Sequence, residues 1–143
     1  MNRFLLRSLL ALMVNGGLHA AEWDARTTRT NTAVSDPDIQ FALTAGMTKE
    51  FVQLYPISQF GIHVLVDRHL LPPPGSEMVY LSLGLCRRLP DGRYELAHAH
   101  YSDVVVLPPG TPPALQRQAV QQKLTQMAGG FSQGMVQRVS RLR

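Results

Sequence analysis

Two histidines separated by one alanine, His98 and His100, are the residues of this chain best placed to do chemistry. They fall in a segment whose pattern predicts a β-strand, and residues two apart on a strand point to the same side of the sheet. Two imidazoles on one side can share a divalent metal ion such as zinc. Because zinc needs three or four ligands, the pair is only part of a site, which His63 would extend if its strand pairs in a suitable register.

The same pair also fits an ordinary half-exposed strand surface, and this is the interpretation we favour. The established catalytic patterns are missing from the sequence. It has no glycine-rich phosphate loop followed by lysine and serine or threonine, no His-Glu-x-x-His and no Gly-x-Ser-x-Gly. We therefore predict a protein that is not an enzyme and has no cofactor. A small-ligand or metal-binding protein using His98 and His100 is the alternative, and a hydrolase with scattered catalytic residues is a third.

Positive charge gathers towards the C-terminus. The last acidic residue is Asp103, and basic residues recur after it, namely Arg117, Lys123, Arg138, Arg141 and Arg143. These charges are too widely spread for the dense basic stripe that nucleic-acid binding requires, so no nucleic-acid partner is expected. We interpret Arg117, Lys123 and Arg138, together with Trp23, as contacts for a partner protein. A homodimer through the segment around Trp23 is left open.

The N-terminus has the plan of a secretory signal peptide. Arg3 and Arg7 precede or flank a short apolar run, and small residues follow, with cleavage expected after Ala20. The run is much shorter than the roughly 20 residues that span a bilayer, so no transmembrane segment should remain after cleavage. Cys86 is the single cysteine, which excludes an internal disulfide and favours a bacterial periplasm over a disulfide-rich secreted class. The expected location is periplasmic or secreted.

The remaining chain fits one small domain. Residues 21–35 are polar and threonine-rich and predict an extended arm, with 22–33 as a candidate edge strand. Apolar spacing predicts a helix over residues 36–55, and alternation predicts a strand over 60–67. Residues 78–86 and 93–107, separated by a turn with Asp91 and Gly92, should form an antiparallel hairpin. A long amphipathic helix should start at Pro112, capped by Thr111, with Gly129 and Gly130 as a point where it kinks or breaks.

These elements predict an α+β domain over residues 36–143 in the order α-β-β-β-α. An antiparallel three-stranded sheet would be covered by the N-terminal helix and the long C-terminal helix. The architecture is similar to that of small envelope accessory domains, such as auxiliary subunits of lipid-transport and secretion systems. We therefore expect an exported, periplasmic accessory or adaptor protein that binds partner proteins in a cell-envelope assembly such as a secretion, pilus or transport system.

Overall fold

The computed structural model describes Trp23, residues 25–72 and residues 75–142, with only the backbone described for residues 96–98. The predicted signal peptide, residues 1–20, lies outside the described residues. The elements follow in the order β1 (Ala25–Thr30), α1 (Asp36–Gly46), α2 (Lys49–Leu54), β2 (Phe60–Leu70), β3 (Glu77–Arg88), β4 (Tyr94–Leu107) and α3 (Pro113–Arg141). None of the described helices is long and apolar enough to cross a membrane.

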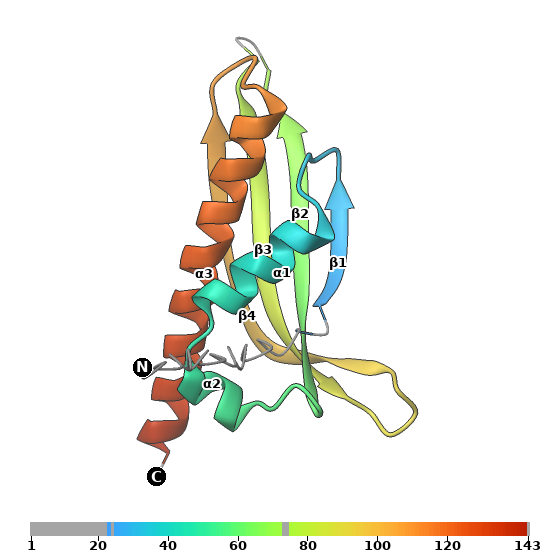
Figure 1. The fold of residues 1–143 in the computed structure, drawn as a ribbon, viewed down its shortest axis with the longest axis vertical. Helices are drawn as coiled ribbons and strands as arrows, with labels where there is room; N and C mark the ends of the chain where they lie inside the picture. The colour runs from blue at the N-terminus through green and yellow to red at the C-terminus, as the bar shows by residue number, and fades with distance from the viewer. Residues whose placement is uncertain (1–22, 24, 73–74, 143) are drawn as a thin grey trace, which may run out of the picture.

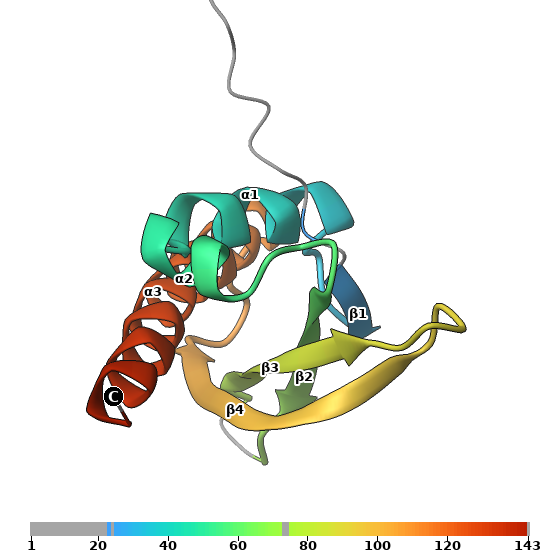
Figure 2. The same cartoon turned by 90° about the horizontal axis from the view of Figure 1, so that it is seen from below.

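The strands form one mixed sheet in the order β1-β2-β3-β4. β2, β3 and β4 pair antiparallel, whereas β1 runs parallel to β2. Helices α1 and α3 cover one face of the curled sheet, and no described element covers the other (Figure 1, Figure 2). The predicted α+β class, the antiparallel hairpin and the long C-terminal helix are confirmed.

One detail of the structure differs from the prediction, and two details decide alternatives that the sequence left open. The first helix is divided into α1 and α2, since Thr48 accepts a hydrogen bond from the Phe51 N–H and starts a new helix after Gly46. The candidate edge strand exists as β1, but its parallel pairing needs a crossover through both helices, which a strand-by-strand pattern does not show. Helix α3 is continuous through Gly129 and Gly130.

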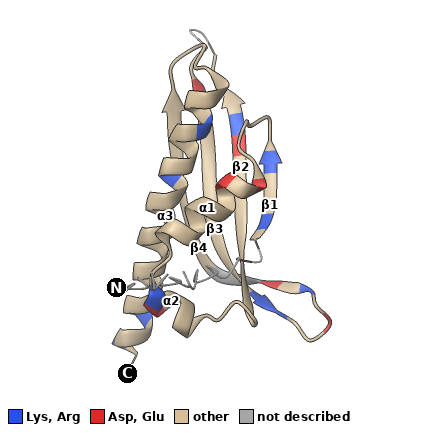
Figure 3. Ribbon diagram, viewed as in Figure 1, with Lys and Arg blue, Asp and Glu red and all other residues tan. Residues whose placement is uncertain are grey.

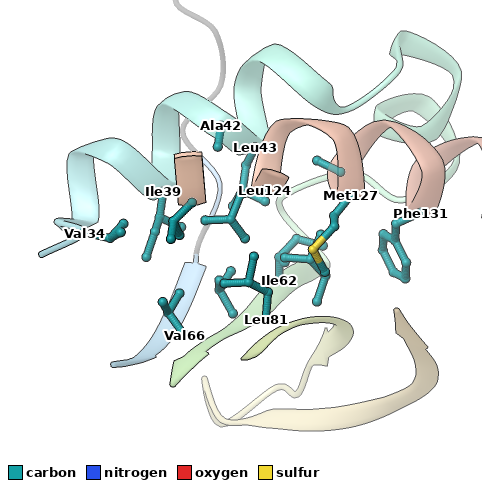
Figure 4. Close-up of a cluster of buried hydrophobic side chains, with 14 of the residues drawn as sticks. Val34, Ile39, Ala42, Leu43, Ile62, Val66, Leu81, Leu124, Met127 and Phe131 are labelled. Atoms are coloured by element: carbon teal, nitrogen blue, oxygen red, sulfur yellow. The ribbon is translucent and has the colours of Figure 1, made fainter. Parts of the chain in front are cut away.

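The core lies between the sheet and the helix layer. Alternate residues of β2 and β3 point towards the helices, as strand periodicity requires, and the apolar stripe of α3 packs onto them (Figure 4). The largest fully buried side chains include Ile62, Val64, Val66, Leu81, Leu83, Leu124 and Met127. This layer fixes α3 alongside β3 and β4.

Trp23 belongs to this core rather than to an exposed arm. Its side chain is only 3% exposed, and its ring centroid lies 5.7 Å from that of Phe51. Pairing of β1 with β2 brings Trp23, which lies two residues before β1, beneath the helices, where burial of a large aromatic ring is strongly favourable. The Trp23 side chain, predicted to contact a partner, is therefore buried in the core of the folded domain.

Helices α1 and α3 cross at a point where only glycine fits. A β-carbon added to Gly46 would lie 2.4 Å from the Thr125 carbonyl oxygen and 2.6 Å from the Ala128 β-carbon. Both distances are far below van der Waals contact. Gly46 thus allows the close helix contact that holds α3 in place over the sheet.

One end of the core is closed by a buried ionic group. Glu77 is 6% exposed and receives two hydrogen bonds from Arg68, of 2.9 and 2.6 Å, and one of 2.8 Å from Gln116 of α3. Hydrogen bonds from the Arg68 guanidinium, and to a smaller extent from Gln116, hold the pKa of the Glu77 carboxyl below its usual value. Because the charge is paired and hydrogen-bonded, it can be buried beside the first turns of α3.

Candidate protein-binding groove at the edge of the sheet

No described strand pairs with the outer edge of β4, a strand of 14 residues. The Val104 N–H donates to the Asp103 side chain at 2.8 Å instead of to β3. In an antiparallel ladder, the N–H and C=O of one residue point to the same side, and the side alternates along the strand. The main-chain groups of Ser102, Val104 and Val106 therefore point away from the sheet. Among the described residues, none outside the strand bonds to these groups.

Two separate depressions lie along this edge, between β4 and α3. The first, of about 320 Å³, is lined by Val104, Val105, Ala119, Gln122, Lys123 and Gln126. The second, of about 160 Å³, is lined by Ala99, His100, Tyr101, Gly130, Phe131, Gly134, Met135 and Arg138. We call the two depressions together the β4–α3 groove. It combines the open backbone of a strand with the flank of a helix, an arrangement suited to an extended peptide.

One ion pair crosses the groove. Lys123 Nζ lies 2.6 Å from Asp103 Oδ2, and both side chains are partly exposed. The Lys123 ammonium, and after it the Val104 N–H, hold the pKa of the Asp103 carboxyl below its usual value. Asp103 is consequently ionised at neutral pH and covers one of the outward N–H groups of β4.

Exposed apolar side chains accompany the open edge. Tyr101 is 41% exposed, Val104 42% and Val106 62%. Tyr101 points to the helix side of the sheet, where its hydroxyl approaches Gly130, whereas Val104 and Val106 alternate with it on the open face. A strand that adds to β4 would find apolar side chains on the open face, and Lys123 and Arg138 beside the Tyr101 ring on the helix side.

The basic residues predicted to bind a partner lie at different places. Lys123 and Arg138 line the groove, one in each depression. Arg117 is exposed in the first turns of α3 and is not among the lining residues. Figure 3 shows Lys and Arg positions coloured blue along the ribbon of α3, which has no Asp or Glu in its sequence.

The predicted metal ligands form no complete site within the described residues. The His100 ring lies against Gly84, and the sheet register places His63, Gly84 and His100 in one row across three strands. The side chain of His98 lies outside the described part of the structure. No group of three or more His, Cys, Asp or Glu side chains that could hold a metal ion occurs among the described residues.

Sequence reasoning missed most of the groove, including Tyr101, Asp103, Gly130 and Gly134. Gly130, together with Gly129, was interpreted as a weak point of the helix, and Gly134 was not considered, although a β-carbon on Gly134 would meet nothing within 4 Å. A glycine in a helix costs about 1 kcal/mol relative to alanine, so a glycine with no packing reason was the signal that could have pointed to this surface.

The comparisons with known proteins add no family to these observations. The chain matches no protein-family model, and it matches no curated protein. The geometry of the β4–α3 groove is therefore the basis for the functional argument that follows.

Proposed function

We propose that this protein is an exported, non-enzymatic accessory protein that binds a partner protein within a cell-envelope assembly, such as a secretion, pilus or transport system. The observation that carries the proposal is the long open edge of β4 beside the β4–α3 groove. Natural proteins usually shorten, charge or cover their edge strands to prevent unwanted pairing. A long edge with exposed apolar residues is consequently best understood as a binding surface.

Two further features support an exported binding protein. The N-terminal sequence has the plan of a signal peptide, as described above. The single cysteine, Cys86, is 3% exposed in the core, a setting that suits a structural thiol better than a reactive one.

The test is capture of partners from the cell envelope. The full-length chain, tagged at its C-terminus, is produced in its own source organism, and bound proteins are identified by mass spectrometry. We expect a defined set of envelope proteins, captured in stoichiometric amounts. Recovery of the protein alone, with no envelope partner, would contradict the proposal.

A matched pair of variants localises the binding. Gly134→Trp places a large side chain in the groove, where a β-carbon meets no neighbour, and should abolish capture. Gln133→Trp adds the same side chain at the adjacent exposed position, which does not line the groove, and should leave capture intact. Equal capture by both variants would place the binding surface elsewhere.

A second candidate function is small-ligand or metal binding at His100. The observation in its favour is the row formed by His63, Gly84 and His100. Metal content measured on the captured sample tests it. About one zinc ion per chain, lost in His98→Ala/His100→Ala, would favour this function, whereas zinc uptake unchanged by that double substitution would exclude the two histidines as ligands.

A further inference from the structure

We infer that the β4–α3 groove binds an extended segment in which acidic and apolar side chains alternate, and that this segment joins the sheet as an added strand beside β4. The inference rests on the proposed function, because it takes the occupant to be part of a partner protein. It goes further by naming the conformation and the chemistry of the bound segment.

The backbone of β4 provides the first argument. Ser102, Val104 and Val106 direct their N–H and C=O groups away from β3, so an extended chain can pair with them as one strand pairs with the next. A bound helix would leave these groups without partners. Strand addition is a common form of peptide recognition for this reason.

The side chains beside the edge provide the second argument. Alternate residues of an added strand would face the helix side and the open face of the sheet. On the helix side they would meet Lys123 and Arg138, and on the open face they would meet Val104 and Val106. Acidic residues suit the first environment and apolar residues suit the second, which predicts their alternation.

Charge complementarity also disfavours a second copy of this chain as the occupant. Helix α3 has basic residues and no acidic ones, and Asp103 of β4 is already paired with Lys123. Antiparallel pairing of two β4 edges would place two basic α3 helices side by side. An acidic strand from another protein neutralises this surface, whereas a second copy adds to its charge.

Asp103 occupies the site that the incoming strand needs. Its carboxylate accepts the Val104 N–H at 2.8 Å and holds Lys123 at 2.6 Å. An acidic segment would supply both interactions, with a carbonyl for the N–H and a carboxylate for the ammonium. Asp103 therefore competes with the occupant and protects the edge when no partner is bound.

The probe for the experiment is a library of random peptides displayed on phage, each about ten residues long, the upper end of the usual strand length. Selection is made on the full-length chain, and the enriched peptides are synthesised for binding measurements. We expect alternation of acidic and apolar residues among them. On binding, the amides of Ser102, Val104 and Val106 should become protected from hydrogen exchange.

Three variants sharpen the measurement. Gly134→Trp should weaken peptide binding at least about tenfold, the loss in affinity that corresponds to one good contact. Gln133→Trp should not change the affinity, because Gln133 does not line the groove. Asp103→Ala should strengthen binding about tenfold by freeing the Val104 N–H and Lys123. Asp67→Ala, which changes the net charge equally but lies on β2, is the matched control and should leave the affinity unchanged.

Several outcomes would overturn the inference. These are enrichment of no sequence, enrichment of basic or helical peptides, or binding that Gly134→Trp does not affect. A dimer in sedimentation that Gly134→Trp dissociates would assign the edge to a second copy and would equally overturn it. If peptides are selected but no envelope protein is captured, only the proposed function is contradicted. If envelope proteins are captured equally well by Gly134→Trp, only the assignment of the binding site to this groove is contradicted.

Discussion

The two edges of the sheet are built in opposite ways. β1 has 6 residues, and its Arg29 donates to the Val34 carbonyl oxygen at 2.9 Å and to Asp36 at 3.2 Å. β4 has 14 residues and exposes Val104 and Val106, with Asp103 covering a single N–H. β1 is short, polar and tied to the segment that follows it, whereas β4 is long and exposes apolar side chains at Val104 and Val106.

This difference indicates which edge suits the proposed binding. Short length and charged side chains are the means by which proteins keep edge strands from pairing, and β1 uses both. β4 keeps its length and its exposed apolar residues next to the β4–α3 groove, as expected of a strand that pairs with another chain. The contrast makes β4, and not β1, the surface to alter first.

The largest expected effect is a difference in stability between proline substitutions at two neighbouring positions of β4. Val105→Pro removes an N–H that bonds to β3 and leaves the facing carbonyl of β3 without its partner, which should destabilise the domain by up to about 3 kcal/mol. Val104→Pro removes an outward N–H and should cost about 1 kcal/mol, the value of its bond to Asp103, while it blocks strand addition. Urea unfolding measures both variants. Equal destabilisation would show that the Val104 N–H does not point away from the sheet, and would contradict the claim that the edge of β4 is open.

The sequence predicted the elements better than the way they pair. Alternation at Ile62, Val64 and Val66 identified β2 and its buried face, and Asp91 with Gly92 identified the hairpin turn, where Gly92 has a φ of 79°. Both signals are local, so they can be found without knowledge of the fold. The parallel β1–β2 pair and the buried Trp23 depend on a crossover through α1 and α2, which leaves no local signal.

The site was predicted only in part, for a related reason. Lys123 and Arg138 were identified from charge, and both line the groove. The open edge of β4 depends on strand order, which was not determined by the pattern of any single strand. Tyr101 and Gly130 come together only because α3 folds back beside β4.

The next largest effect concerns the support of the groove. Gly46→Ala should destabilise the domain by about 1–3 kcal/mol, because its β-carbon would overlap the Thr125 carbonyl and force α1 away from α3. Gly129→Ala at the same crossing is the control, since its β-carbon would be 3.5 Å from the nearest atom, an ordinary contact. That control should be neutral or stabilising by up to about 1 kcal/mol. Thermal unfolding distinguishes the two, and similar losses in both would contradict the close crossing.

A smaller effect should appear on acidification at β4. The pKa of Asp103 is lowered in the folded state by Lys123, so its contribution to stability is complete above the unfolded pKa, about 3.9. That contribution is lost as the pH falls through the lower folded pKa. Asp103→Asn should therefore be less stable than the wild type at pH 7, and the difference should narrow on acidification. A difference that does not change with pH would show that the ion pair with Lys123 contributes no stability.

The smallest effect is expected at β1. Arg29→Ala removes an ion pair that is partly exposed, with Arg29 35% and Asp36 60% accessible, so the loss of stability should be below about 1 kcal/mol. Partner capture and peptide affinity should remain at the wild-type level, because the proposed binding edge lies on the opposite side of the sheet. Lys49→Ala, which removes an exposed positive charge from α2, is the control. Self-association caused by Arg29→Ala alone would show that the charge on β1 is what prevents that edge from pairing. The two edges would then differ only in how well they are protected, and the contrast between them would no longer support β4 as the binding edge.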